Sequence, residues 1–226
     1  PTQIVIKPPY GINFTSNNQL CRTILEGITL EGTAGQSTVG IDASAGRVIL
    51  RDVILKNLLT AMHVYGEAYV QSLSFSTLTV DTNQGGSGGI VCEENSFTEL
   101  LGPVEISGVG STYIRVTTGA VFVHRYATMD MVGAGGSEVG LYVDKEGVVY
   151  IAAGWDMDAM QGGVSVGERG TLYIAGASFT LNDVGEPFNI GEFGVVIAES
   201  SGFSYTGSTP LILYLSPGAF LHSSSI

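Results

Sequence analysis

A short phrase that begins with glycine and alternates apolar residues recurs along the chain. It reads GVVYIAAGWDMDAM from Gly147, GTLYIAGASFTLN from Gly170 and GVVIAESSGFSY from Gly194. Further copies begin at Gly46, Gly66, Gly119 and Gly218, and two degenerate copies carry Ser96 and Asn18 in the glycine position. Successive copies lie 20 to 30 residues apart. Repeats of this length, each too small to bury its own apolar face, indicate an architecture of stacked units.

Each unit contains three short segments with the two-residue period of β-strands. Val164 and Val166 precede the marker Gly170, and Leu172 and Ile174 follow it, before a third alternation that ends the unit. A propeller blade needs roughly 40 to 50 residues, and no leucine-rich signature is present. Three strands per unit therefore predict a solenoid of triangular coils.

Equivalent positions of the repeats carry similar side chains, as expected for parallel strands that stack ~4.8 Å apart. The second residue after the marker reads Val48, Ala68, Thr98, Val121, Val149, Leu172, Val196 and Phe220. The fourth reads Leu50, Val70, Leu100, Val123, Ile151, Ile174, Ala198 and His222. We therefore predict an all-β, right-handed parallel β-helix of about nine coils. It forms a single domain over residues 1–226, with residues 1–10 as a lead-in and 11–226 as coils.

Composition restricts the ligands of such a domain. The net charge of −12 argues against nucleic acid, and the longest apolar runs fall far short of the ~20 residues of a membrane helix. Cys21 and Cys92 are expected to be unpaired structural thiols. The three histidines, His63, His124 and His222, lack zinc-ligand spacing, so no metal or cofactor is expected. A neutral or weakly charged ligand fits this chain best.

The third residue after the marker should point away from the core, yet it is apolar or aromatic in seven of eight copies. This column reads Ile49, Tyr69, Glu99, Phe122, Tyr150, Tyr173, Ile197 and Leu221. A stripe of this size is larger than soluble monomers usually expose. We predict that its apolar members form the interface of a symmetric homo-oligomer. The alternative is that a terminus or the segment 82–89 covers the stripe.

Aspartates supply the candidate chemistry. In the phrase WDMD the side chains of Asp156 and Asp158 should point outward together, and TMDM places Asp130 on the corresponding strand one coil earlier. Such carboxylates can act as acid and base in glycoside hydrolysis, contact a ligand or cation, or merely be solvated. No acid has an apolar sequence context that would raise its pKa for general-acid work. Trp155, Tyr150 and Tyr173 are candidate sugar contacts.

The glycine-marked coils of irregular length, the scarcity of lysine and the apolar outer stripe together resemble the tailspikes and tail fibres of bacteriophages. The resemblance spans the whole chain and is architectural, because no phrase such as GTLYIAGASF is diagnostic of that family. It implies a homotrimer, assembled in the host cytoplasm and exposed on the virion, whose partners are other virion proteins and a bacterial surface polysaccharide. The chain begins with proline, so we expect a fragment of a longer fibre or spike.

Two classes of function remain open. The first is a noncatalytic fibre protein that presents a rod to a host polysaccharide, a role that the passenger domain of a bacterial autotransporter-type adhesin would share. The second is a polysaccharide depolymerase, either a glycoside hydrolase or a lyase. The sequence favours the first class, because no acid has an apolar context that would raise its pKa for general-acid work. Arg125 near Asp130 is too weak a signal for a lyase site.

Overall fold

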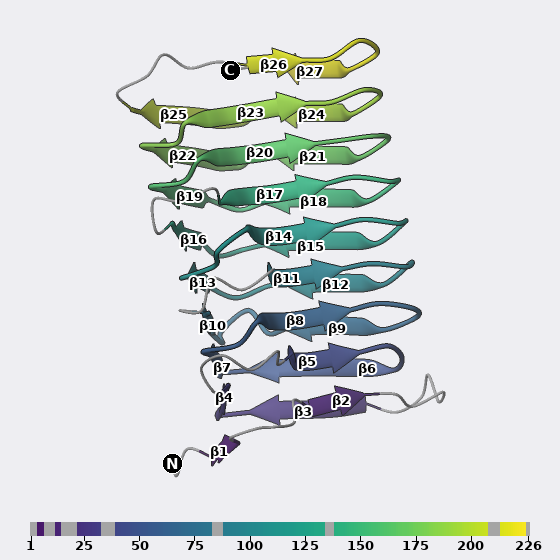
Figure 1. The fold of residues 1–226 in the computed structure, drawn as a ribbon, viewed down its shortest axis with the longest axis vertical. Helices are drawn as coiled ribbons and strands as arrows, with labels where there is room; N and C mark the ends of the chain where they lie inside the picture. Colours follow the sequence, from purple (N-terminus) through teal and green to yellow (C-terminus); the bar gives the residue numbers. More distant parts are fainter. Residues whose placement is uncertain are drawn as a thin grey trace.

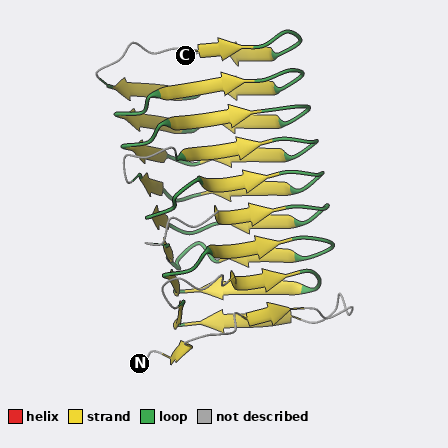
Figure 2. Ribbon diagram, in the orientation of Figure 1, coloured by secondary structure: helices red, strands yellow, loops and turns green. Residues whose placement is uncertain are grey.

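The fold is an all-β parallel solenoid built from three parallel sheets of nine strands each (Figures 1 and 2). It was obtained as a computed structural model that describes residues 4–6, 12–14, 22–32, 39–82, 88–133, 138–207 and 213–224. Successive strands enter the three sheets in turn, so that every strand pairs with the strand three places along the chain. The predicted fold class is thereby confirmed.

The three sheets have the following members. Sheet A contains β1 (Ile4–Ile6), β4 (Ile28–Glu31), β7 (Val53–Lys56), β10 (Leu78–Asp81), β13 (Val104–Ser107), β16 (Met129–Val132), β19 (Trp155–Asp158), β22 (Ser178–Asn182) and β25 (Gly202–Thr206). Sheet B contains β2 (Ile12–Phe14), β5 (Val39–Ala43), β8 (Thr60–Val64), β11 (Gly88–Cys92), β14 (Thr112–Val116), β17 (Val139–Val143), β20 (Gly162–Val166), β23 (Glu186–Ile190) and β26 (Leu213–Leu215). Sheet C contains β3 (Arg22–Glu26), β6 (Arg47–Arg51), β9 (Tyr69–Ser72), β12 (Phe97–Leu100), β15 (Val121–Arg125), β18 (Val148–Ala152), β21 (Thr171–Ala175), β24 (Val195–Glu199) and β27 (Phe220–Ser224).

The amino-terminal segment is more than a lead-in. Residues 4–6 form β1, which pairs in parallel with β4 and so begins sheet A. The boundary expected after residue 10 therefore does not separate the coils from what precedes them.

The core is a continuous column of side chains enclosed by the three sheets. Alternate residues of each strand point inward and stack on the equivalent residues of the neighbouring coils. Trp155, Phe179 and Phe203 are register partners on β19, β22 and β25, and their ring centroids lie 5.6 and 5.5 Å apart along the stack. Cys92 is also in the core, and burial raises the pKa of its thiol to about 12. Cys21 lies outside the described residues.

Two coils have a register that differs from the predicted one. On β15 the inward residues are Phe122 and His124, both fully buried, so the predicted inward pair Val121 and Val123 faces outward. On β27 it is Leu221 that pairs with the inward Val196. Phe122 and Leu221 were predicted as outward interface residues, and His222 as inward; all three orientations are wrong.

The turns between sheets B and C explain the shift. Seven of these turns are closed by a hydrogen bond from the fourth N–H to the first carbonyl, and they span residues 65–68, 93–96, 117–120, 144–147, 167–170, 191–194 and 216–219. Gly119 and Gly218 take the third position, where φ is 75° and 78°. Gly147, Gly170 and Gly194 take the fourth position. In the sequence repeat these two kinds of glycine stand for one marker, although they occupy different turn positions. The inward and outward residues predicted for β15 and β27 are therefore shifted by one.

In the three turns that have glycine at the fourth position, the reason for glycine differs from that at the third. A Cβ placed on Gly170 would lie 2.6 Å from the Val143 carbonyl oxygen, and one on Gly194 would lie 2.6 Å from that of Val166. The turn therefore packs directly against the backbone of the preceding coil. At the third position a positive φ is the requirement, and Glu94, Thr118 and Lys145 at the second position also have a positive φ. Residues other than glycine therefore pay a conformational cost at both positions.

Candidate functional site

The acidic row predicted on one strand face lies on the outer surface of sheet A. Asp130 on β16 and Asp156 on β19 are direct register partners, because Met129, Met131 and Met157 take the inward positions. Asp158 lies two residues further along β19. All three carboxylates are exposed. The prediction that they share one face is confirmed.

The row continues in both directions along sheet A. Glu105 on β13 pairs with Asp130, and Thr180 on β22 and Ser204 on β25 follow Asp156 in the same column. The sequence phrase VEIS carried the signal for Glu105, since its glutamate stands between two buried apolar residues. Five successive strands thus present one polar side chain each, at the ~4.8 Å spacing of neighbouring strands.

Asp156 has the most perturbed environment of the row. Partial burial, followed by the neighbouring charges of Asp130 and Asp158, raises the pKa of its carboxyl group. Asn182 donates a hydrogen bond to Asp156 Oδ1 at 3.3 Å and accepts one from Thr206 at 2.6 Å. The expectation that no acid has a raised pKa is therefore wrong for Asp156. The row can accept hydrogen bonds from hydroxyl groups, and Asp156 is its best proton carrier.

Trp155 cannot contact a ligand on this face. Its side chain is 1% exposed and points into the core, where the indole N–H donates a 2.8 Å hydrogen bond to His124 Nδ1. Burial lowers the pKa of His124 to about 4, although a backbone group of Gly102 opposes the shift. Since Nδ1 accepts from Trp155, the proton of the neutral ring is on Nε2. The assignment of Trp155 as a ligand contact is corrected to a core role.

The outward column of sheet C contains only part of the predicted interface. Tyr150 and Tyr173 are register partners that point outward, and Ile197 follows them in the same column. Tyr173 is 39% exposed, and the Arg125 guanidinium lies 5.4 Å from the ring centroid of Tyr150. Ile49 occupies the same column but is only 1% exposed. Phe122 and Leu221 are excluded because they point into the core.

Sheet C is polar at its amino-terminal end. Arg47 lies over the ring of Tyr69, 4.7 Å from its centroid, and donates to Gln71 Oε1 at 2.7 Å. Tyr69 and Gln71 both donate to Glu99 Oε2, at 2.8 and 2.9 Å. Burial and then Glu99 raise the pKa of Tyr69 to about 12. Tyr69 is therefore outward as predicted, but it belongs to a hydrogen-bonded network that separates it from the apolar part of the sheet.

Sheet B carries a second polar row that the sequence reasoning missed. Its outward column includes Asp42, His63, Arg115 and Tyr142 on strands β5, β8, β14 and β17. Tyr142 donates a 2.8 Å hydrogen bond to Asp144. The four residues stand in repeats of different length, so no fixed spacing in the sequence connects them. Only the register of the sheet places them in one column, in which Val91 of β11 stands between His63 and Arg115.

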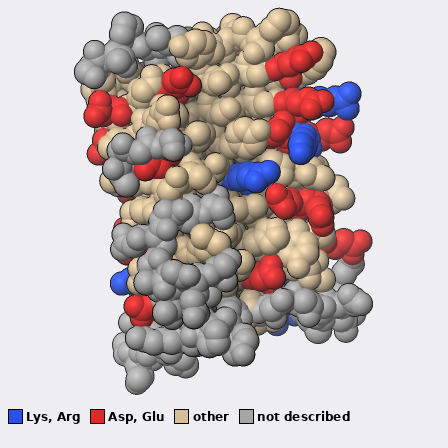
Figure 3. Space-filling view, viewed as in Figure 1, with Lys and Arg blue, Asp and Glu red and all other residues tan. Residues whose placement is uncertain are grey.

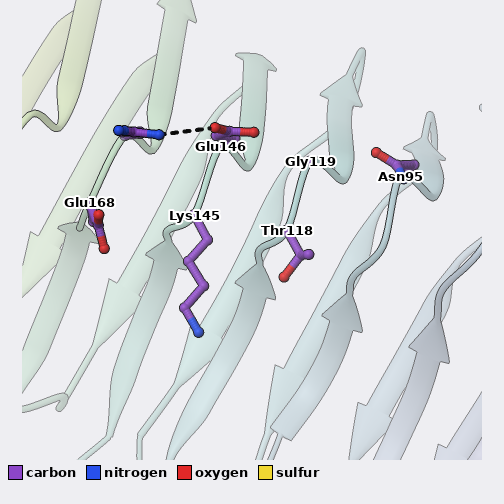
Figure 4. A pocket seen from close by; sticks show the side chains of 7 residues that line it. Asn95, Thr118, Gly119, Lys145, Glu146 and Glu168 are labelled. Atoms are coloured by element: carbon purple, nitrogen blue, oxygen red, sulfur yellow. Dashed lines mark hydrogen bonds and ion pairs between the residues drawn. The ribbon is translucent and has the colours of Figure 1, made fainter.

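The stacked turns between sheets B and C form a shallow groove of about 400 Å³ (Figure 4). Its lining residues are Asn95, Thr118, Gly119, Lys145, Glu146, Glu168 and Arg169. Arg169 pairs with Glu146 at 3.4 Å, and the side chains of Lys145 and Glu168 extend to the same side in Figure 4. Figure 3 shows acidic side chains, with a few basic ones, gathered along this edge of the molecule. The exposed ion pair contributes little to stability.

An apolar hollow of about 290 Å³ lies at the carboxyl-terminal end of the core. It is lined by Phe188, Val196, Phe203, Leu213 and Leu221, of which the last three are 39 to 43% exposed. These are inward positions of the last coils, with no further coil among the described residues to cover them. The hollow is therefore the end of the core and not a separate ligand site.

Fold and surface together define the class of this protein as a parallel β-solenoid with polar rows on sheets A and B and a mixed outer face on sheet C. Comparisons with protein-family models, with curated proteins and with solved structures found no match for the chain.

Within the described residues, no group of three or more histidine, cysteine, aspartate or glutamate side chains is placed to hold a metal ion. The described part of the chain also has no helix that could cross a membrane.

Proposed function

We propose that this protein is a noncatalytic fibre component, a stiff β-solenoid that displays an outer face to a bacterial surface polysaccharide. In this proposal it belongs to the tail fibre or tailspike of a bacteriophage, is exposed on the virion and is joined to other virion proteins. The parallel β-solenoid fold supports the proposal because such a rod holds surface groups at fixed spacing over its whole length.

One observation carries the proposal: the regular row of exposed hydrogen-bonding groups on sheet A. Glu105, Asp130, Asp156, Thr180 and Ser204 stand on consecutive strands and point outward. Carboxylates accept hydrogen bonds from the hydroxyl groups of a sugar chain, and the hydroxyls of Thr180 and Ser204 both accept and donate them. No lysine or arginine stands in this row, so a neutral glycan suits it better than an acidic one.

We further propose that copies of the chain associate through the carboxyl-terminal part of sheet C, in a homotrimer. Tyr150, Tyr173 and Ile197 form the outward column there, and Val121 and Val195 lie beside it in the neighbouring outward column. Side chains of this kind are enriched in protein interfaces. The polar network around Tyr69 marks the boundary of this contact.

Glycan binding is tested with an array of purified capsular and O-antigen polysaccharides. We expect at least one to bind, and Asp130→Asn and Asp156→Asn to weaken that binding by roughly ten-fold each, as when a charged hydrogen-bond partner is lost. Glu146→Gln, which removes a carboxylate from the turn groove, is the matched control. Binding that survives both sheet A substitutions and fails in the control would assign the glycan to the groove instead.

The interface is tested by light scattering on the purified chain. We expect a trimer that Tyr173→Asp converts to monomers, because the substitution buries a charge in an apolar contact. Thr180→Asp introduces the same charge on sheet A and should leave the trimer intact. A wild-type protein that stays monomeric at high concentration would remove the interface proposal.

A depolymerase is the second candidate, and the raised pKa of Asp156 beside Asp130 is the observation that favours it. A carboxyl group whose pKa is raised is the better candidate for a general acid, with a neighbouring carboxylate as base or nucleophile. Release of reducing ends or unsaturated products from a bound polysaccharide would support this reading. If such release persisted in the Asp156→Asn variant, the protein would be a depolymerase but Asp156 would not be its general acid.

A further inference from the structure

The imidazole of His63 lies between carboxylates from two other coils on the outer face of sheet B. His63 Nδ1 is 3.2 Å from Asp42 Oδ1, and His63 Nε2 is 3.4 Å from Glu93 Oε2. Asp42 stands on β5, His63 on β8, and Glu93 directly follows β11, so the three side chains connect three successive strands. All three side chains are between 25 and 29% exposed, which leaves the cluster open to protons from solvent.

A neutral imidazole cannot satisfy both contacts. It has one N–H, and its other nitrogen presents a lone pair, which repels a carboxylate oxygen. A protonated imidazole has two N–H groups and donates to both carboxylates, and each hydrogen bond is then strengthened by charge. The geometry around His63 therefore fits the protonated ring.

Glu93 has a second partner available in the next coil. Its Oε1 lies 4.0 Å from Nη2 of Arg115 on β14, while its Oε2 is the oxygen near His63. The ring of His63 is stacked on Tyr65, with centroids 4.5 Å apart, and this stacking holds the ring in place. When the contact between His63 and Glu93 weakens, it is the Glu93 side chain that is free to turn toward Arg115.

We propose that His63 is a proton-operated clamp on sheet B. With the ring protonated, Asp42, His63 and Glu93 are bridged across three strands, and the four charges of the cluster, including Arg115, sum to zero. With the ring neutral, the cluster has a net charge of −1, the ring keeps its 3.2 Å contact with Asp42, and Glu93 moves to Arg115. The charged groups that the described contacts place around His63 are Asp42, Glu93 and, behind Glu93, Arg115. This proposal does not depend on the proposed function.

The clamp should control the turn that follows β11. Glu93 is the first residue of the turn 93–96, which is closed by a 3.2 Å hydrogen bond from the Ser96 N–H to the Glu93 carbonyl. A side chain bridged to His63 restrains this turn, whereas a released one does not. The turn 144–147 has the same hydrogen bond but begins with Asp144, whose partner is Tyr142 and not a histidine.

The test is amide hydrogen exchange on the whole chain at about pH 5.5 and about pH 8, corrected for intrinsic rates, with the ¹⁵N shifts of the His63 ring recorded in parallel. We expect the protection of the turn 93–96 to fall by roughly ten-fold at the higher pH, as when one charge-assisted hydrogen bond is lost. The turn 144–147 should not change.

Two variants make the result decisive. Glu93→Gln should keep the turn protected at both pH values, because its amide can donate to the lone pair of a neutral His63. His63→Gln should leave the turn weakly protected at both. The proposal is overturned if both turns lose protection equally, if the pH effect persists in His63→Gln, or if the ring titrates with no change at Glu93.

Discussion

Mild acid should destabilise the solenoid through His124, a buried side chain whose neutral form the core requires. The pKa of this imidazole is lowered to about 4 in the folded state, against 6.5 for a free histidine. Because the pKa of His124 is lower in the folded than in the unfolded state, neutral His124 makes its full contribution to the free energy of unfolding above pH 6.5. This contribution is lost as the pH falls toward 4. The difference of about 2.5 units corresponds to roughly 3 kcal/mol, of which about 2 kcal/mol is already lost at pH 5.

Trp155 makes this prediction easy to follow, since it is the only tryptophan of the chain and contacts His124 directly. Urea unfolding monitored by its fluorescence at about pH 7 and about pH 5 gives the two free energies of unfolding. His124→Leu should cost about 1 to 3 kcal/mol at pH 7, because the indole N–H loses its acceptor. It should also remove most of the loss between the two pH values.

His222→Gln is the control, because His222 is exposed on the outer face of β27 and its loss should leave the contribution of His124 in place. The reasoning is refuted if His124→Leu loses as much stability between pH 7 and pH 5 as the wild-type protein does. In that case the acid sensitivity would come from carboxylates, and the burial of His124 would not explain it.

Three further predictions concern packing and turns, and all are read from free energies of unfolding. Phe122→Ala should cost about 3 to 5 kcal/mol, and Val123→Ala clearly less, because only Phe122 belongs to the central core. If Val123→Ala were the more destabilising substitution, the register predicted from the sequence, with Val123 inward, would be the correct one. Gly147→Ala should cost about 2 kcal/mol through collision with the preceding coil, whereas Gly202→Ala, with open space around it, should cost little. Glu94→Gly should raise the free energy of unfolding by about 1 kcal/mol, since Glu94 is exposed and has a φ of 52°. If the free energy of unfolding did not rise, the backbone at Glu94 would not be strained.

The column of acids on sheet A shows what the alternation of residues within single strands can predict. Alternation along WDMD and TMDM is a property of single strands, so it predicted that Asp130 and Asp156 share a face. The raised pKa of Asp156 was not predictable in the same way, because it depends on burial by neighbours and on the charges beside it. Sequence distance gave no sign that Glu105 would extend the row.

The contacts of His63, in contrast, could not be predicted from the sequence. Its partners Asp42 and Glu93 lie 21 and 30 residues away in units of different length, and each has an ordinary polar context in the sequence. Only the parallel pairing of β5, β8 and β11 brings them to the imidazole. The contact of His124 with Trp155 likewise depends on a register that the glycine pattern misplaced by one residue.

The sequence by itself determined the class of fold, because a two-residue alternation repeated at intervals of 20 to 30 residues leaves a stacked parallel solenoid as the way to bury every apolar face. It also determined, within each strand, which residues are paired on one face. The tertiary structure decided the register between coils, since glycine stands at the third residue of some turns and at the fourth of others. A shift of one residue exchanges the inward and outward faces of the strand that follows. Through that register it decided which charges meet, and therefore where the chemistry of this surface lies.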